Sequence, residues 1–116
     1  PAVEKLEREL SDRKIPLFAK FDHAANAREA GLELRPTTVL VFGSPLVGTG
    51  LMQKDQSISL ELPLKISVWE DEAGSTWLAF PRISKMASDY GLDSHPAVPK
   101  MELLMENLVR KAGSVY

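Results

Sequence analysis

Two kinds of hydrophobic spacing divide the chain into predicted helices and strands. Apolar residues three or four positions apart are typical of amphipathic helices, and they predict helices over 1–13, 82–90 and 98–112. Alternating or consecutive apolar residues predict strands over 14–22 and 39–42 and a hairpin over 64–80. A further short helix over 24–30 is predicted from its ends, because Asp22 is a good N-cap and Gly31 a good C′ residue.

The strand predicted over 39–42 is the centre of the expected sheet. Its four apolar residues are consecutive, which suggests a strand covered on both faces and therefore flanked by others. It ends at Gly43, and a glycine-spaced turn over 48–50 leads into Leu51 and Met52, which with Val47 indicate a helical turn or short helix. The segment 54–59 reads as a polar connection, and Leu60, Leu62 and Leu64 read as a buried approach to the next strand.

The hairpin is the clearest local prediction. Residues 70–74 form the turn, in which Gly74 can adopt a positive φ. A turn centred on Ala73 places Trp69 opposite Trp77 and Val68 opposite Leu78. One face of the hairpin then carries Leu64, Ile66, Val68, Leu78 and Phe80, and the other carries Lys65, Ser67, Trp69, Trp77 and Ala79.

These elements predict one α+β domain over 1–116, in which helices pack on a small antiparallel sheet of about four strands. At 116 residues, with 44% hydrophobic and 26% charged residues, the composition is that of an ordinary globular domain. A net charge of −2 without a basic cluster argues against nucleic acid and anionic membranes as partners. The absence of cysteine excludes disulfides, thiol nucleophiles and cysteine-ligated metals.

No stretch approaches the roughly 18 apolar residues of a membrane span, and no signal peptide is visible. We therefore expect a cytoplasmic protein. The chain begins at Pro1 without a methionine, which fits a processed or trimmed form.

Several motifs in order resemble the family called domain of unknown function 302. They are Asp22-His23-Ala24-Ala25-Asn26-Ala27, Gly31-Leu32-Glu33-Leu34-Arg35-Pro36-Thr37, Val41-Phe42-Gly43-Ser44-Pro45, Gly48-Thr49-Gly50-Leu51-Met52, Leu62-Pro63-Leu64-Lys65 and Val68-Trp69-Glu70-Asp71-Glu72. The resemblance covers roughly residues 3–92 and leaves the C-terminal helix, 98–112, outside it. It implies a small α+β domain around an antiparallel sheet, often dimeric, and it brings no established activity or cofactor.

The first candidate site is the glycine-rich segment after the central strand, with Gly43, Ser44, Gly48, Thr49 and Gly50 as candidate ligand-binding residues. A phosphate-binding P-loop needs lysine where Thr49 stands, and the dinucleotide fingerprint has a different glycine spacing. The simpler interpretation is that the glycines allow close packing at a sharp strand exit. The alternative is weak anion binding by backbone N–H groups. Ser44 lacks the context of a nucleophile elbow.

The second candidate is the pair Asp22 and His23, the only catalytic candidates. A carboxylate beside an imidazole can make a general base, although sequence neighbours on a strand point to opposite faces. The simpler interpretation is a capping Asp22 and a packed His23. A site shared with Gly43 and the segment 48–50 requires that the strands ending at Asp22 and Gly43 run parallel. If they are antiparallel, the two turns lie at opposite ends.

A metal site is not predicted. Glu70, Asp71 and Glu72 offer oxygen ligands for Mg²⁺ or Ca²⁺, but one hairpin turn lacks the spacing of a calcium loop. His95 has no partner at metal-ligand spacing.

Trp69 and Trp77 are the strongest physical indication of a partner. The face they share must be covered by helices, a second subunit or a ligand, because large exposed apolar patches are rare. We therefore expect a homodimeric small-ligand-binding or assembly module, with Trp69 and Trp77 among its candidate ligand-binding residues. The alternative is a small enzyme that uses His23 with a nearby carboxylate as acid and base.

Overall fold

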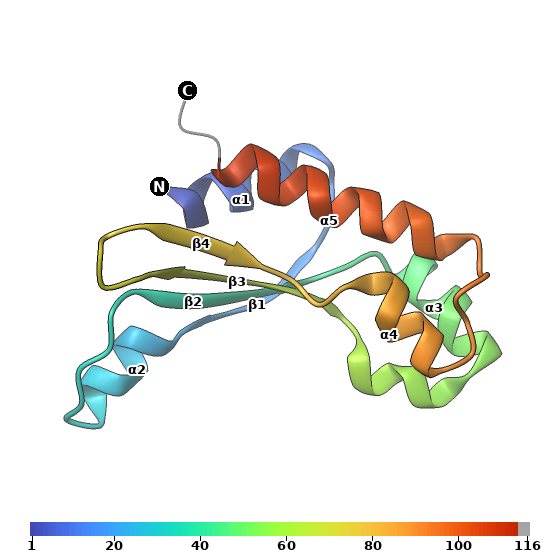
Figure 1. Ribbon diagram of the computed structural model, residues 1–116, viewed down its shortest axis with the longest axis horizontal. Helices are drawn as coiled ribbons and strands as arrows, with labels where there is room; N and C mark the ends of the chain where they lie inside the picture. The colour runs from blue at the N-terminus through green and yellow to red at the C-terminus, as the bar shows by residue number, and fades with distance from the viewer. Residues whose placement is uncertain (114–116) are drawn as a thin grey trace.

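The computed structural model describes residues 1–113, which form one antiparallel sheet with helices around it (Figure 1). The strands are β1 (Leu17–Asp22), β2 (Thr37–Phe42), β3 (Leu64–Glu70) and β4 (Thr76–Ala79). They follow one another in space in chain order, and each pairs antiparallel with the next. The predicted α+β class is confirmed, and β2 lies inside the sheet beside the β3–β4 hairpin as expected.

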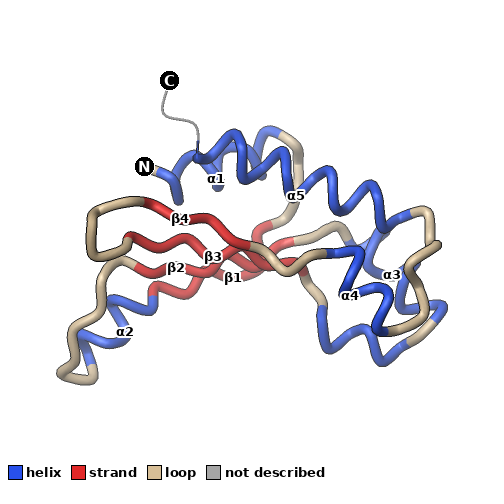
Figure 2. The backbone as a smooth tube through the Cα atoms, in the orientation of Figure 1, coloured by secondary structure: helices blue, strands red, loops and turns tan. Residues whose placement is uncertain are grey.

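The helices cover one face and both ends of this sheet. They are α1 (Ala2–Asp12), α2 (His23–Glu29), α3 (Pro45–Lys54), the 3₁₀ helix η1 (Gln56–Glu61), α4 (Ile83–Asp89) and α5 (Ala97–Gly113). In Figures 1 and 2, α1 and α5 lie together over one face, α3 and α4 gather at one end of the sheet, and α2 lies at the other end.

The core lies between the covered face of the sheet and the helices. Leu40 and Phe42 of β2 and Ile66 of β3 are fully buried, because alternate strand residues point to the same side. The α5 stripe is spaced as the sequence predicted, so that Val98, Met101, Met105, Leu108 and Ala112 are buried. Leu6 and Leu10 of α1 complete the layer, and the contact of α1 with α5 closes it.

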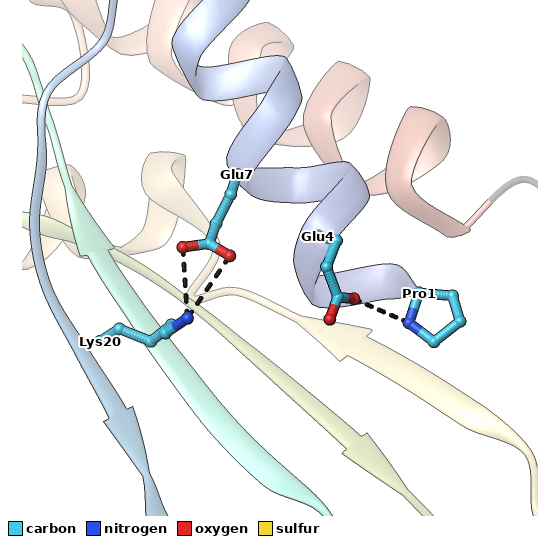
Figure 3. Close-up of polar contacts among 4 residues, drawn as sticks. All are labelled: Pro1, Glu4, Glu7 and Lys20. Atoms are coloured by element: carbon cyan, nitrogen blue, oxygen red, sulfur yellow. Dashed lines mark hydrogen bonds and ion pairs between the residues drawn. The ribbon is translucent and has the colours of Figure 1, made fainter.

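A polar contact also ties α1 to the sheet. Lys20 of β1 points to the helix side, and its Nζ lies 3.3 Å from Oε1 of Glu7 (Figure 3). In the same helix the amino group of Pro1 lies 2.8 Å from Oε2 of Glu4 (Figure 3). The Pro1–Glu4 pair is exposed and the Lys20–Glu7 pair is partly exposed, so each contributes little to stability and mainly orients its side chains.

The opposite side of the sheet, here called the outer face, lies away from α1 and α5. The pairing of the strands assigns to it Ala19, Phe21, Thr37, Val39, Val41, Lys65, Ser67, Trp69, Trp77 and Ala79. Phe21 and Trp77 are 48% and 53% exposed. Val39 and Val41 are only half-buried, so the expectation that β2 is covered on both faces is not met within residues 1–113. β-branched residues such as these valines suit a pleated strand whether or not a helix covers them.

The hairpin register agrees with the prediction. Trp69 pairs with Trp77 and Val68 with Leu78, and the two indole rings stack with centroids 6.3 Å apart. Gly74 has φ +83°, as its place in the turn requires.

The segment between β2 and β3 differs most from the sequence prediction. The short helix predicted from Val47, Leu51 and Met52 is α3, but it also includes Gly48 and Gly50, which were predicted to form a turn. The expected polar connection is occupied by the end of α3 and by η1. Leu60 is 80% exposed rather than buried, because in η1 it is Ile58 that points into the core. Leu62 is half-buried and Leu64 is buried.

Two contacts hold α4 and η1 in place at this end of the sheet. Glu102 of α5 accepts a hydrogen bond from the backbone N–H of Ile83, 3.0 Å away, at the start of α4. The hydroxyl of Tyr90, at the other end of α4, donates to Oε2 of Glu61 at 3.0 Å. The end of the sheet where β2 stops is thus framed by α3, η1, α4 and α5.

Candidate functional site

An apolar pocket of about 310 Å³ opens where β2 ends and β3 begins. We name it the α3 pocket, because α3 forms much of its wall. Its lining comes from five elements and the loops between them: Phe18, Gly43, Ser44, Pro45, Val47, Gly48, Thr49, Met52, Ser59, Leu62, Pro63, Leu64 and Met101. Its volume lies at the lower end of the range of about 300–1,000 Å³ for small-molecule sites.

The sequence explains why α3 begins beside this pocket. Ser44 has an extended backbone at the N-cap and Pro45 occupies the first helical position, which proline favours. The hydroxyl of Ser44 makes no capping hydrogen bond in α3, although serine commonly does so. Ser44 therefore lines the pocket with its hydroxyl uncommitted to the helix.

The two glycines of α3 lie against side chains of neighbouring segments. A methyl group built on Gly48 would lie 3.7 Å from Cδ1 of Leu62 and 3.8 Å from Cε of Met52. A methyl group on Gly50 would lie 3.8 Å from Cε1 of His95. These are ordinary contact distances, so Gly48 faces the α3 pocket and Gly50 faces the ring of His95.

A second pocket of about 380 Å³ adjoins the first on the side of α5. We name it the His95 pocket, and its lining is Ser44, Val47, Leu64, His95, Pro96, Ala97, Lys100, Met101 and Leu104. Ser44, Val47, Leu64 and Met101 line both pockets, so the two form neighbouring parts of one apolar region.

The polar groups of this region are few and are mainly donors. The Nδ1 atom of His95 accepts a hydrogen bond from the N–H of Ala97 at 3.0 Å. In a neutral imidazole that accepts at Nδ1, the proton sits on Nε2. Lys100 adds an ammonium group, and the only ionisable residues among the two linings are Lys100 and His95.

Two ionisable groups near the site have shifted pKa values with structural causes. The hydroxyl and backbone N–H of Ser57 both donate to Asp55, and they lower the pKa of that carboxyl while starting η1. The Glu61 carboxylate that accepts the Tyr90 hydroxyl raises the pKa of Tyr90. Both arrangements stabilise the frame of the pocket rather than line it.

The predicted ligand-binding residues fall into two groups. The first group, which lines the α3 pocket, consists of Gly43, Ser44, Gly48 and Thr49. Gly50 belongs to the same helix but lies against the ring of His95 instead of lining that pocket. Trp69 and Trp77 lie on the outer face toward the opposite end of the strands, because Phe42 pairs with Leu64 and Thr37 with Trp69. Neither the α3 pocket nor the His95 pocket includes Trp69 or Trp77 in its lining.

The predicted catalytic candidates are also far along the sheet from the α3 pocket. β1 and β2 are antiparallel, with Asp22 opposite Thr38 and Leu17 opposite Phe42. The turns after Asp22 and after Gly43 therefore lie at opposite ends, which removes the site that they would share in a parallel arrangement. Asp22 caps α2 by accepting from the N–H of Ala25 at 2.9 Å, and the ring of His23 stacks on Phe21.

Within the acidic turn, the Asp71 carboxylate is engaged in hydrogen bonds inside the hairpin. Asp71 accepts hydrogen bonds from the N–H groups of Ala73 and Ser75 and from the indole of Trp77. Across residues 1–113, no three histidine, aspartate or glutamate side chains are grouped to hold a metal ion. Across the same residues, no helix has the length and apolar character needed to cross a membrane.

Sequence reasoning missed the residues that the C-terminal half brings to the site. In the sequence, His95 has the character of an isolated possible metal ligand, and Lys100 and Met101 belong to the helix predicted over 98–112, whereas all three line the His95 pocket. The one local signal is that His95-Pro96 directly precedes α5, where a side chain can bond to a free backbone N–H.

Comparison with known proteins identifies the family. The domain of unknown function DUF302 matches residues 1–109, and the chain belongs to this family. The match extends further toward the C-terminus than the motifs quoted above. A crystal structure of an uncharacterized conserved DUF302 protein from Bacillus stearothermophilus has the same fold, with a TM-score of 0.83 and 17% identity. The structural match covers 96% of this chain and 88% of the chain of that protein.

Curated relatives carry a different kind of name. The chain is 37% identical over 101 residues to proteins named fluoride-specific ion channel FluC 1, from Brucella suis biovar 1 and from Brucella abortus biovar 1. The match covers 85% of this chain but only 40% and 37% of those relatives. The chain thus spans about two fifths of the length of the named channels.

Proposed function

We propose that this domain binds a small, largely apolar molecule in the α3 pocket. The observation that carries the proposal is the pocket itself, about 310 Å³ lined mostly by apolar side chains with a few polar groups at its rim. Sites of this shape commonly bind small molecules, because they remove apolar ligand surface from water while a few polar groups set orientation.

A ligand library read by thermal shift tests this proposal without assuming a reaction. Compounds that bind the folded protein and not the unfolded chain raise its melting temperature, by an amount that grows with the ratio of free ligand concentration to Kd. We expect apolar compounds of moderate size to stabilise the wild type and to lose that effect in Gly48→Leu, whose side chain extends into the pocket beside Leu62 and Met52.

The matched control is Ser88→Leu, which adds the same side chain at an exposed position of α4 that does not line the pocket. Every compound that raises the melting temperature of the wild type should also raise that of Ser88→Leu. Circular dichroism of both variants separates a filled pocket from a lost fold. A library without stabilising compounds, or compounds that stabilise folded Gly48→Leu equally well, would overturn the proposal.

A second function, assembly into a homodimer, is supported by the outer face. Phe21, Trp69 and Trp77 form an apolar surface with one charged residue, Lys65, among the residues assigned to that face. Large exposed apolar patches favour protein contacts. The occupant we propose is a second copy, because the face complements itself. Lys65 and Trp69 lie toward opposite ends of β3 on this face. If two copies pack face to face about a two-fold axis perpendicular to the strands, Lys65 of each copy lies over the tryptophans of the other, which suits a cation–π contact.

Sedimentation tests the dimer. The wild type should sediment as a dimer at about ten micromolar, within the range of ordinary dimer affinities. Phe21→Glu should give monomers, since it places a charge in the proposed interface. Leu46→Glu is the control, because Leu46 is 88% exposed on α3, away from this face. A monomeric wild type, or a dimer disrupted by Leu46→Glu alone, would contradict the outer-face interface.

The alternative of a small enzyme that uses His23 with a nearby carboxylate stays a prediction. The carboxylate next to His23 in sequence is engaged in capping α2. The expected cytoplasmic location also stays a prediction.

A further inference from the structure

The geometry points to a more specific ligand class, and this inference rests on the proposed function. We propose that the α3 pocket and the His95 pocket together bind an amphipathic carboxylate. The apolar chain of the ligand occupies the α3 pocket, and its carboxylate lies against His95 and Lys100 in the His95 pocket.

The two pockets are suited to the two parts of one molecule. They share Ser44, Val47, Leu64 and Met101, so a ligand that crosses this shared wall contacts both. The α3 pocket has no ionisable residue in its lining, and its deepest neighbours include Met101, which is almost fully buried. The methionines Met52 and Met101 can adapt to a flexible chain, because their side chains are unbranched and polarizable.

The polar end is defined by donors. The hydrogen bond from Ala97 to Nδ1 of His95 leaves Nε2 as the ring nitrogen that can donate. The ring lies against Gly50 of α3 on one edge and is also part of the lining of the His95 pocket. Lys100 can donate only, and the Ser44 hydroxyl makes no capping bond that would occupy it. Three donors beside an apolar region are matched by a carboxylate, which has only acceptors when ionised.

The same composition selects against other head groups. No aspartate or glutamate belongs to either lining, so a cationic head would meet Lys100 without a counter-charge. A neutral alcohol would satisfy one or two donors and would gain nothing from the charge of Lys100. The expected order of affinity is therefore carboxylate, then alcohol, then amine.

Three probes with one chain length test this order: decanoate, 1-decanol and decylammonium. Binding is measured by titration calorimetry below the concentrations at which these molecules self-associate. We expect decanoate to bind at least about fivefold more tightly than decanol, which corresponds to one favourable, partly exposed ion pair. Decylammonium should bind most weakly.

Variants of the donors place the head group. Lys100→Ala should weaken decanoate by about fivefold and leave decanol unchanged. The matched control is Lys85→Ala, which removes another exposed lysine from α4 and changes the net charge equally. His95→Asn should also weaken decanoate, while its side-chain oxygen replaces Nδ1 as acceptor for the N–H of Ala97 and preserves the start of α5.

The outcomes separate this inference from the proposed function. Equal affinity for all three probes, or equal loss in Lys100→Ala and Lys85→Ala, overturns the carboxylate assignment while an apolar pocket remains. If decanol and decanoate both bind Gly48→Leu with the same affinity as the wild type, the α3 pocket is not the binding site, and the proposed function is overturned. Selective binding of decanoate that is lost in Lys100→Ala and in His95→Asn, both still folded, supports the proposal.

Discussion

The indole Nε1 of Trp77 donates a hydrogen bond of 2.7 Å to Oδ2 of Asp71, across the turn that joins β3 to β4. The other carboxylate oxygen of Asp71 accepts from the N–H groups of Ala73 and Ser75, each at 2.9 Å. One side chain therefore fixes both the turn and the position of a tryptophan on the outer face. This bonding accounts for Asp71 within the acidic turn that otherwise resembles a cation site.

These bonds predict that acid loosens the hairpin. Donation from Trp77, followed by that from the backbone N–H of Ser75, lowers the pKa of Asp71 below its ordinary value. A lowered pKa in the folded state means that the carboxylate contributes stability above the ordinary aspartate pKa. That contribution is lost as the pH falls through the folded-state pKa. Denaturant unfolding followed by tryptophan fluorescence, from about pH 6 down to about pH 3, should show this loss.

The matching variant is Asp71→Asn, which cannot ionise. It should be less stable than the wild type near neutral pH and should lose less stability on acidification. Glu72→Gln serves as the control, because Glu72 is exposed and has only a 4.0 Å pair with Arg35. If Asp71→Asn and the wild type lose stability in parallel, Asp71 is not the group that titrates.

The hairpin was predictable because its pairing is local. Trp69 and Trp77 alternate with apolar residues on either side of a turn with a single glycine, so one register satisfies both faces. The direction of β1 relative to β2 was not predictable in this way. It depends on how α2 and the following loop return the chain, and two short helix-bound strands are compatible with either direction.

The pocket lay further beyond sequence reasoning. Glycine is a poor helix former, so Gly48 and Gly50 predicted a turn, whereas α3 is helical with Leu62 and His95 packed close to those glycines. Met101 reaches the pocket from a helix some fifty positions away in the chain. No spacing within the segment 43–52 indicates those partners.

This explanation of the glycines predicts that alanine stabilises α3. Gly48→Ala and Gly50→Ala each place a methyl group at an ordinary contact distance from its nearest neighbours. Each should raise the free energy of unfolding by about 0.5–1 kcal/mol through helix propensity and reduced unfolded-state entropy. Chemical denaturation measures the change.

Gly31 provides the opposite case for comparison. It ends α2 with φ +80°, a conformation that alanine adopts only at a cost, although the space around it is open. Gly31→Ala should therefore lower stability by about 1 kcal/mol. Destabilisation by Gly48→Ala as large as that by Gly31→Ala would contradict the contact distances described for α3.

Glu102 is predicted to be the most sensitive polar residue of the frame. α4 begins at the buried Ile83 without a side-chain cap of its own, and the acceptor for the Ile83 N–H is the Glu102 carboxylate from α5. Glu102→Ala leaves that donor unpaired and should cost about 1–2 kcal/mol. Glu106→Ala, an exposed position one turn further along α5, should change stability by less than about 0.5 kcal/mol. Similar losses in both variants would mean that Glu102 does not act as the cap of α4.

The contact between Tyr90 and Glu61 predicts a pH effect at the alkaline end. The Glu61 carboxylate accepts the Tyr90 hydroxyl and thereby raises the pKa of that phenol. Because the folded state holds the proton more tightly, the contact stabilises the fold fully below the ordinary tyrosine pKa. The stabilisation is lost as the pH rises through the higher folded-state pKa.

Glu61→Gln keeps an acceptor but removes the charge, so the pKa of Tyr90 should move back toward its ordinary range. Ultraviolet absorbance of the ionised phenol measures the titration, and Tyr90→Phe assigns it. An unchanged Tyr90 titration in Glu61→Gln would show that the carboxylate is not the cause of the shift.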